Sequence, residues 1–256
     1  MHTPKHSEQH SFSVRPTTVR FEYGDGTLIP SNGNTAVIRP AAPGTYKVVA
    51  TYLDKNGNSI ETYKTFTAAD PLSVKLEPSK VYALVSEKVT LDAQVTGGFS
   101  TISYSYSYAD GTAITGSSRT LGLTQKTAGE YTVKVKVKDG MGSQAEDEVT
   151  YYVADAITVS ASADTKYVNI GSTGTITMDA SGGYGDFTYE FALEDGTLLP
   201  TQGNKGIFKP TVAGTYVVTP TAIDKHGNRK SASKITIKSP LALESPKAIL
   251  PALNPS

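Results

Sequence analysis

The sequence contains no cysteine and no tryptophan, and its 24 basic and 24 acidic side chains cancel each other. Without cysteine, the chain has no disulfide framework, no thiolate zinc site and no thiol nucleophile. A formal net charge of zero provides no field to hold a phosphate backbone, so we expect no nucleic-acid binding. No apolar run reaches the length of a membrane span, so we also expect no membrane insertion.

Helical periodicity is also missing, because no ten-residue stretch repeats its apolar residues at the spacing of a helix. The chain instead has 23 glycines and 15 tyrosines, together with many threonines, serines and valines. This composition is typical of short strands joined by tight turns. The sequence therefore predicts an all-β protein.

Three landmarks recur along the chain at one fixed spacing. An Asp-Gly turn returns after 110 − 25 = 85 and 195 − 110 = 85 residues. The same step separates a glycine that precedes a tyrosine by two positions, and a second turn aspartate: Gly44, Gly129 and Gly214, and Asp54, Asp139 and Asp224. A period that three landmarks keep without insertion predicts tandem copies of one folding unit.

The period divides the chain into an arm, three copies and a tail. We expect a flexible arm at residues 1–10, a shortened first copy at 11–70, a second at 71–155, a third at 156–240 and a C-terminal tail at 241–256. The arm carries His2, His6 and His10 at steps of four, which could align a metal site on a helix. Pro4 and the lack of an apolar face favour a flexible arm over metal binding.

Alternating residues indicate which face of each strand is buried. Tyr104, Tyr106 and Tyr108 alternate with serines and could form a sugar-stacking platform. The other copies place valine or leucine among the equivalent residues, which favours a core face: Val19, Phe21 and Tyr23, and Tyr189, Phe191 and Leu193. Lys134, Lys136 and Lys138 similarly indicate the solvated side of one strand and not a basic patch.

The run Phe21-Glu22-Tyr23-Gly24-Asp25-Gly26-Thr27, followed by Pro-Gly-Thr-Tyr and Asp-Lys-Asn-Gly-Asn, resembles the polycystic-kidney-disease (PKD) domains and bacterial Ig-like domains. The resemblance implies three tandem Ig-like antiparallel β-sandwiches in an extended array, the first one shortened at its N-terminus. Phe21, Tyr106 and Phe191 replace the usual tryptophan of the family. The resemblance also implies that a tyrosine hydroxyl ties back to the preceding connection at Tyr46, Tyr131 and Tyr216.

We found no motif for catalysis, and we expect no enzyme activity, no cofactor and no metal. The six repeated aspartates sit beside glycines, where a carboxylate accepts hydrogen bonds from its own turn: Asp25, Asp110, Asp195, Asp54, Asp139 and Asp224. Calcium is the alternative at Asp54-Lys55-Asn56-Gly57-Asn58, although this loop lacks a later bidentate acid. Pro220 lies in the long strand of the third copy, where we expect a bulge or an open edge.

Two loops place an aromatic residue beside glycines, and we select them as contact candidates: Gly98 with Phe99, and Gly183 with Tyr184. The alternative is an aromatic that caps the end of its own domain. By family analogy, the chain is a non-catalytic spacer and adhesion module that contacts a protein or a surface glycan. It would be displayed on a bacterial surface, or on a phage virion if Met1 is the native start.

Two alternative functions remain open. The copies could be accessory domains of a secreted glycan-degrading enzyme. The chain could also associate head to tail into filaments, because Pro240-Leu241-Ala242-Leu243-Glu244 resembles the start of another copy, Pro71-Leu72-Ser73-Val74-Lys75. Leu241 to Leu250 of one molecule would then complete the first copy of the next.

Overall fold

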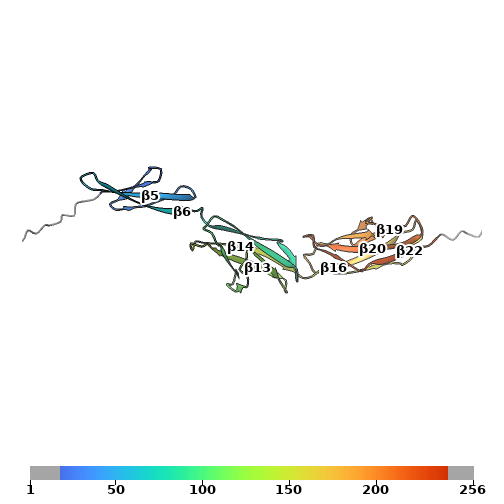
Figure 1. Cartoon of the computed structure of the whole chain (residues 1–256). Coiled ribbons are helices and arrows are strands. Elements are labelled where there is room, and N and C mark those ends of the chain that lie inside the picture. Colours follow the sequence, from blue (N-terminus) through green and yellow to red (C-terminus); the bar gives the residue numbers. More distant parts are fainter. Residues whose placement is uncertain (1–17, 242–256) are drawn as a thin grey trace, which may run out of the picture. The chain divides into compact units, whose positions relative to one another are not determined.

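The computed structural model describes residues 18–241, which form strands and turns without any helix (Figure 1). The all-β prediction is therefore confirmed. None of these residues forms a helix long and apolar enough to cross a membrane. The predicted arm with its three histidines, and the tail beyond Leu241, lie outside the described residues.

The first copy forms one four-stranded sheet and a small hairpin. The sheet has the order β2-β1-β5-β6, with β1 (Thr18–Tyr23), β2 (Leu28–Ile29), β5 (Gly44–Leu53) and β6 (Ser59–Ala68). The hairpin consists of β3 (Ser31–Asn32) and β4 (Thr35–Ala36). Between residues 18 and 70, no second large sheet packs against the apolar residues of β1 and β5.

The second copy is an Ig-like sandwich of two sheets. One sheet has the order β11-β10-β13-β14-β8 and the other β12-β9-β7. Its strands are β7 (Ser73–Pro78), β8 (Tyr82–Leu84), β9 (Lys88–Thr96), β10 (Ser103–Tyr108), β11 (Ala113–Ile114), β12 (Thr120–Thr124), β13 (Gly129–Lys138) and β14 (Gln144–Ala154). The short strand β8 pairs in parallel with β14, so that Tyr82 lies opposite Tyr152.

The third copy repeats this arrangement with one interrupted edge. Its sheets are β15-β16-β19-β18, and β17-β20-β21 with β22 also paired to β20. The strands are β15 (Thr158–Ala163), β16 (Gly174–Ser181), β17 (Thr188–Leu193), β18 (Thr201–Gln202), β19 (Lys205–Phe208), β20 (Gly214–Ile223), β21 (Arg229–Ser231) and β22 (Ile235–Ser239). The core contains Ile176, Met178, Phe191, Phe208, Val218 and Ile237.

Pro220 explains the interruption. Strand β20 continues through Pro220 opposite Phe191, but the edge strand on its other side is divided into β21 and β22. Proline has no N–H to offer a neighbouring strand. Only the Pro220 carbonyl bonds across this gap, to the N–H of Ala232 at 2.9 Å. The expected open edge is thus present, and it takes the form of a gap in the partner strand.

The alternating residues lie on the faces that the sequence predicts. Tyr106 and Phe191 are buried, and the residues beside them on the same strand face are half-buried. Val133, Val135 and Val137 are fully buried while the lysines between them are exposed. Lys134 pairs with Glu148 at 3.5 Å and Lys136 with Glu146 at 2.9 Å, across β13 and β14.

Contacts group the chain into two compact units. One contains the residues up to Val74 with the loops Val95–Ser103 and Val137–Ala145, and the other contains the rest of the second copy together with the third.

Candidate functional site

The Asp-Gly turns are closed by their own aspartates. Oδ1 of Asp25, Asp110 and Asp195 accepts a hydrogen bond from the backbone N–H of the threonine two residues later, at 2.9, 2.8 and 2.9 Å. These hydrogen bonds lower the pKa of each carboxyl group below its ordinary value. All three turns are exposed, and each carboxylate serves its own turn.

The second set of aspartates makes larger networks. Oδ1 of Asp224 accepts hydrogen bonds from the N–H groups of His226 and Asn228, at 2.9 and 3.0 Å. Oδ1 of Asp139 accepts two in the same way, and so does Oδ1 of Asp54. These carboxylates already accept several N–H groups of the protein, which fits the turn interpretation at Asp54 better than the calcium alternative. Within residues 18–241, no group of three or more His, Cys, Asp or Glu side chains is arranged to hold a metal ion.

Asp139 and Asp224 also hold a distant loop. Oδ2 of Asp139 accepts a hydrogen bond from the N–H of Phe99 at 3.0 Å, and Oδ2 of Asp224 accepts one from Tyr184 at 3.1 Å. Burial alone would raise the pKa of both carboxyl groups, but the hydrogen bonds that they accept lower it below the ordinary value, led by the N–H of Phe99 for Asp139 and by the side-chain amide of Asn228 for Asp224. Each aspartate thus connects its hairpin to the glycine-rich loop that carries the candidate aromatic.

The glycines of these loops lie against the linker that precedes the same copy, and a side chain at some of these positions would overlap the linker backbone. The N–H of Gly98 bonds to the carbonyl of Asp70 at 2.9 Å, and the N–H of Gly183 bonds to that of Asp155 at 3.0 Å. A Cβ on Gly182 would lie 2.2 Å from the carbonyl oxygen of Ala156. Gly97 has the same relation to Pro71, also at 2.2 Å. The linker backbone therefore crosses directly over each loop.

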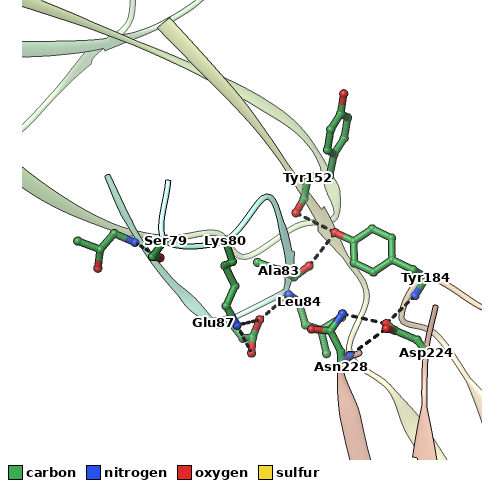
Figure 2. Close-up of polar contacts among 10 residues, drawn as sticks. Ser79, Lys80, Ala83, Leu84, Glu87, Tyr152, Tyr184, Asp224 and Asn228 are labelled. Carbon is green, nitrogen blue, oxygen red and sulfur yellow. Dashed lines mark hydrogen bonds and ion pairs between the residues drawn. The ribbon is translucent and has the colours of Figure 1, made fainter. Parts of the chain in front are cut away.

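Tyr184 reaches from the third copy to the second, as Figure 2 shows. Its hydroxyl group lies 2.9 Å from the carbonyl oxygen of Ala83 and 2.8 Å from that of Tyr152. Ala83 and Tyr152 belong to the parallel pair β8 and β14. Burial raises the pKa of the Tyr184 hydroxyl, so it stays protonated and remains a donor at neutral pH.

Three further aromatic rings surround this contact. His226 stacks on Tyr82 with ring centroids 3.5 Å apart, and meets Tyr184 edge to face at 4.8 Å. Tyr82 in turn stacks on Tyr152 at 5.6 Å. We call Tyr82, Tyr152, Tyr184 and His226 the aromatic joint. Aromatic rings packed in this way stabilise a contact through the apolar area that they bury and through their preferred stacked and edge-to-face arrangements.

The acceptor side of the aromatic joint is itself fixed (Figure 2). Glu87 accepts a hydrogen bond from the N–H of Leu84 at 2.9 Å, and both of its carboxylate oxygens lie 3.2 Å from Nζ of Lys80. This pair holds the turn after β8, next to the Ala83 carbonyl that accepts from Tyr184. The joint therefore connects two structured segments.

The candidate residues have different surroundings. Tyr184 belongs to the aromatic joint and Gly183 bonds to the linker beside it, while Gly98 and Phe99 are partly buried in the equivalent loop of the second copy. Tyr46, Tyr131 and Tyr216 each donate a hydrogen bond to the carbonyl of the residue four positions earlier, at 2.6, 2.9 and 2.8 Å. Each of these tyrosines ties the start of a long strand to the connection before it.

Sequence reasoning missed Tyr82, Tyr152 and His226. Each is a single exposed or half-buried residue with no motif of its own, and Tyr82 lies more than a hundred residues before its partners in the third copy. The sequence does contain a signal for the contact between the aromatic loop and the turn aspartate. The aromatic residue and the turn aspartate are separated by the same step in both copies, since 139 − 99 = 224 − 184 = 40.

Comparison with known proteins identifies a family for one part of the chain. Residues 73–151 match the PKD domain family, whereas no curated protein matches the chain. Among solved structures, the chain is similar to three N-terminal domains of the bacteriophage RB49 highly immunogenic outer capsid protein (Hoc). The identity is 19%, the alignment covers 90% of this chain and 91% of that one, and the TM-score is 0.45.

Two further solved structures are similar. The I-band fragment I67–I69 of titin is 17% identical, with 89% of each chain covered and a TM-score of 0.41. Fibronectin(III)-like modules of Clostridium thermocellum CbhA are 17% identical, with 64% of this chain and 95% of that one covered and a TM-score of 0.44. At these values, no functional inference rests on the structural likeness. The match therefore identifies a PKD domain at residues 73–151, and the 85-residue period relates the first and third copies to it in sequence.

Proposed function

We propose that the chain is a non-catalytic spacer and adhesion module, displayed on a bacterial surface or on a phage virion. The non-catalytic and spacing roles are taken by analogy with the PKD family that residues 73–151 match. The observation that carries the proposal is the aromatic joint. The sequence indicates Tyr184 as a contact residue, and its hydroxyl group connects the third copy to the carbonyl oxygens of Ala83 and Tyr152 in the second. A spacer requires such a joint, because flexible linkers do not maintain a distance.

The joint has three properties that limit bending between the second and third copies. The linker carbonyl of Asp155 is bonded to Gly183 of the loop. The Tyr184 hydroxyl is shared between two carbonyl oxygens of the second copy, and three rings pack around it. Bending at this seam would break the hydrogen bonds and separate the rings together.

Amide relaxation measured on the full chain tests the proposal. In the unmodified protein we expect the second and third copies to share one rotational correlation time. Tyr184→Phe removes the two hydrogen bonds while keeping the ring, and Tyr184→Ala removes both, so the two correlation times should separate in this order. Tyr167→Phe, which alters an exposed tyrosine of the third copy, is the control and should change nothing. Independent tumbling in the unmodified protein would refute the spacer function.

A second candidate function is head-to-tail association through the first copy. Its sheet leaves an apolar recess of about 200 Å³ between Phe21, Ile38, Val48, Ala50 and Phe66. A sheet that lacks a strand leaves backbone donors unpaired at its edge, beside an apolar groove, and some proteins use this to accept a strand from a neighbour. Leu241 to Leu250 of another molecule is the occupant we propose. Light scattering over a concentration series, with and without residues 241–256, tests this, and a mass that stays monomeric in both cases rejects it.

Contact with a protein or a surface glycan is the adhesion part of the proposal. If the copies are instead accessory domains of a glycan-degrading enzyme, the chain should bind an insoluble polysaccharide in a pull-down. A pure spacer should remain in the supernatant.

A further inference from the structure

The third copy contains a recess whose lining is basic. It has a volume of about 580 Å³ and lies between the end of β15, the segment at residues 166–167 and strand β22. The polar and aromatic groups that line it are Ser162, Lys166, Tyr167, Lys234, Thr236 and Lys238. This volume is within the range of pockets that hold small ligands.

Two of its three ammonium groups have no carboxylate partner among the described residues. Lys234 forms an ion pair with Glu194 at 3.2 Å. Within residues 18–241, no Asp or Glu oxygen lies within 4.0 Å of Nζ of Lys166 or Lys238. Asp164 is nearby in sequence, but its Oδ1 accepts the N–H of Thr175 at 3.0 Å. The recess therefore carries positive charge that the surrounding residues leave largely uncompensated.

In the second copy, the strand edge that is equivalent to this recess is the pair β8 and β14, which forms the acceptor side of the aromatic joint. Tyr167 pairs in parallel with Lys238, as Tyr82 pairs with Tyr152 in the second copy. The period places Lys166 at the position of Val81, since 166 − 85 = 81. In the second copy this edge holds the rings of Tyr184 and His226.

The two substitutions change what this edge can bind. Val81 and Tyr152 offer apolar and aromatic surface, whereas Lys166 and Lys238 line the recess together with Tyr167 and bring two ammonium groups to it. The Tyr167 side chain is 64% exposed, compared with 39% for Tyr82. An exposed ring and two cations in the lining of one recess suit a ligand that has a flat apolar face and negatively charged substituents.

We propose that this recess binds an acidic saccharide. The ring of Tyr167 would pack against the C–H face of a sugar, and the ammonium groups of Lys166 and Lys238 would bind its carboxylate or sulfate groups. The hydroxyls of Ser162 and Thr236 provide donors and acceptors for sugar hydroxyls. The inference rests on the adhesion part of the proposed function and names the ligand class for it. It does not depend on the aromatic joint.

Amide chemical shifts of the full chain, titrated with four probes, test this inference. The probes are an alginate hexasaccharide, a heparin-derived hexasaccharide, neutral cellohexaose and hexaglutamate. We expect shifts at residues 162–167 and 234–238 with at least one acidic saccharide, and the tighter of the two identifies carboxylate or sulfate as the preferred group. Added salt should weaken this binding. Cellohexaose and hexaglutamate should bind at least tenfold more weakly.

Two matched double variants separate the recess from general charge. Lys166→Gln with Lys238→Gln should reduce the affinity at least tenfold, and Tyr167→Ala should also reduce it while leaving the charge intact. Lys134→Gln with Lys136→Gln removes two exposed lysines of the second copy that are paired with glutamates, and should leave the affinity unchanged. Unchanged melting of the variants excludes unfolding as the cause.

Three results would overturn the inference: no shift at the recess with either acidic saccharide, equal binding of hexaglutamate, or equal affinity of the two lysine double variants. None of them affects the joint, which amide relaxation of the Tyr184 variants measures separately. A flexible joint with saccharide binding at the recess would refute the spacer function alone.

Discussion

The carboxylate of Asp224 accepts a hydrogen bond from the backbone N–H of Tyr184 at 3.1 Å. One hairpin of the third copy thereby holds the loop that reaches the second copy. The same carboxylate accepts the N–H groups of His226 and Asn228 and the side-chain amide of Asn228. Tyr184 and His226 are both part of the aromatic joint, so a single acidic group orders two of its four residues.

Asp224→Ala should therefore destabilise the third copy and loosen the joint. The substitution leaves several partly buried N–H groups without their acceptor, which costs about 2 kcal/mol in the free energy of unfolding. Urea denaturation, followed through the amide signals of the third copy, measures this loss. We also expect the ring signals of Tyr184 and His226 to move toward the values of exposed side chains.

Asp195→Ala is the matched control. Asp195 belongs to the same copy and is also a turn aspartate, but its carboxylate accepts one backbone hydrogen bond, from Thr197, in an exposed turn. Its loss should be much smaller, and the signals of Tyr184 should not move. Equal effects of the two substitutions would contradict the role assigned to Asp224.

The period of 85 residues contained most of the information about the fold. It identified the turns, the buried strand faces and the tyrosines at the start of the long strands, because each is determined by residues close in sequence or by strict alternation. Tyr106 and Phe191 show this well. Both lie in the middle of the predicted core face, and both are buried.

The aromatic joint could not be predicted in the same way. An aromatic between glycines is typical of contact loops, which makes Tyr184 a candidate from sequence alone, but its partners depend on how two copies meet. Tyr82 contributes to the joint in the second copy, while the equivalent Tyr167 is exposed beside two lysines. Tyr82 and Tyr167 occupy the same position in the repeat, but their surroundings differ because Tyr82 contacts residues of the next copy.

Gly182→Ala should be more destabilising than a glycine substitution elsewhere in the same loop. Gly182 has a φ of +80°, and an added Cβ would lie 2.2 Å from the carbonyl oxygen of Ala156. Backbone atoms of the linker must move to relieve this overlap, which adds about 1–3 kcal/mol to the cost of a left-handed alanine. Urea denaturation of the third copy measures the difference.

Gly185→Ala isolates the conformational part of that cost. Gly185 has a similar φ of +71°, but nothing lies within 4 Å of a Cβ placed there. This variant should lose only about 1 kcal/mol, the cost of the left-handed conformation. The hydrogen bond from the Gly183 N–H to the Asp155 carbonyl should persist in Gly185→Ala and weaken in Gly182→Ala. Amide exchange of Gly183 measures this difference. An equal loss of unfolding free energy in the two variants would show that the linker backbone moves away from the added Cβ without destabilising the copy.

The stability of the second copy should fall at alkaline pH because of Tyr106. Its hydroxyl donates to the carbonyls of Ser118 and Arg119, both at 2.9 Å, and burial raises the pKa of Tyr106 to about 12. The unfolded chain has a tyrosine pKa of about 10. The fold therefore favours the protonated form, and this contribution is complete below pH 10 and is lost as the pH rises toward about 12.

Tyr106→Phe should make this alkaline decline shallower while lowering stability at neutral pH, because two carbonyls lose their donor. The decline should persist in part, since burial also raises the pKa of Tyr151. Tyr63→Phe, which alters an exposed tyrosine of the first copy, should keep the decline of the unmodified protein. Urea denaturation at several pH values between 8 and about 12 gives the slopes. If Tyr106→Phe has the same slope as the unmodified protein, the buried Tyr106 hydroxyl does not control alkaline unfolding.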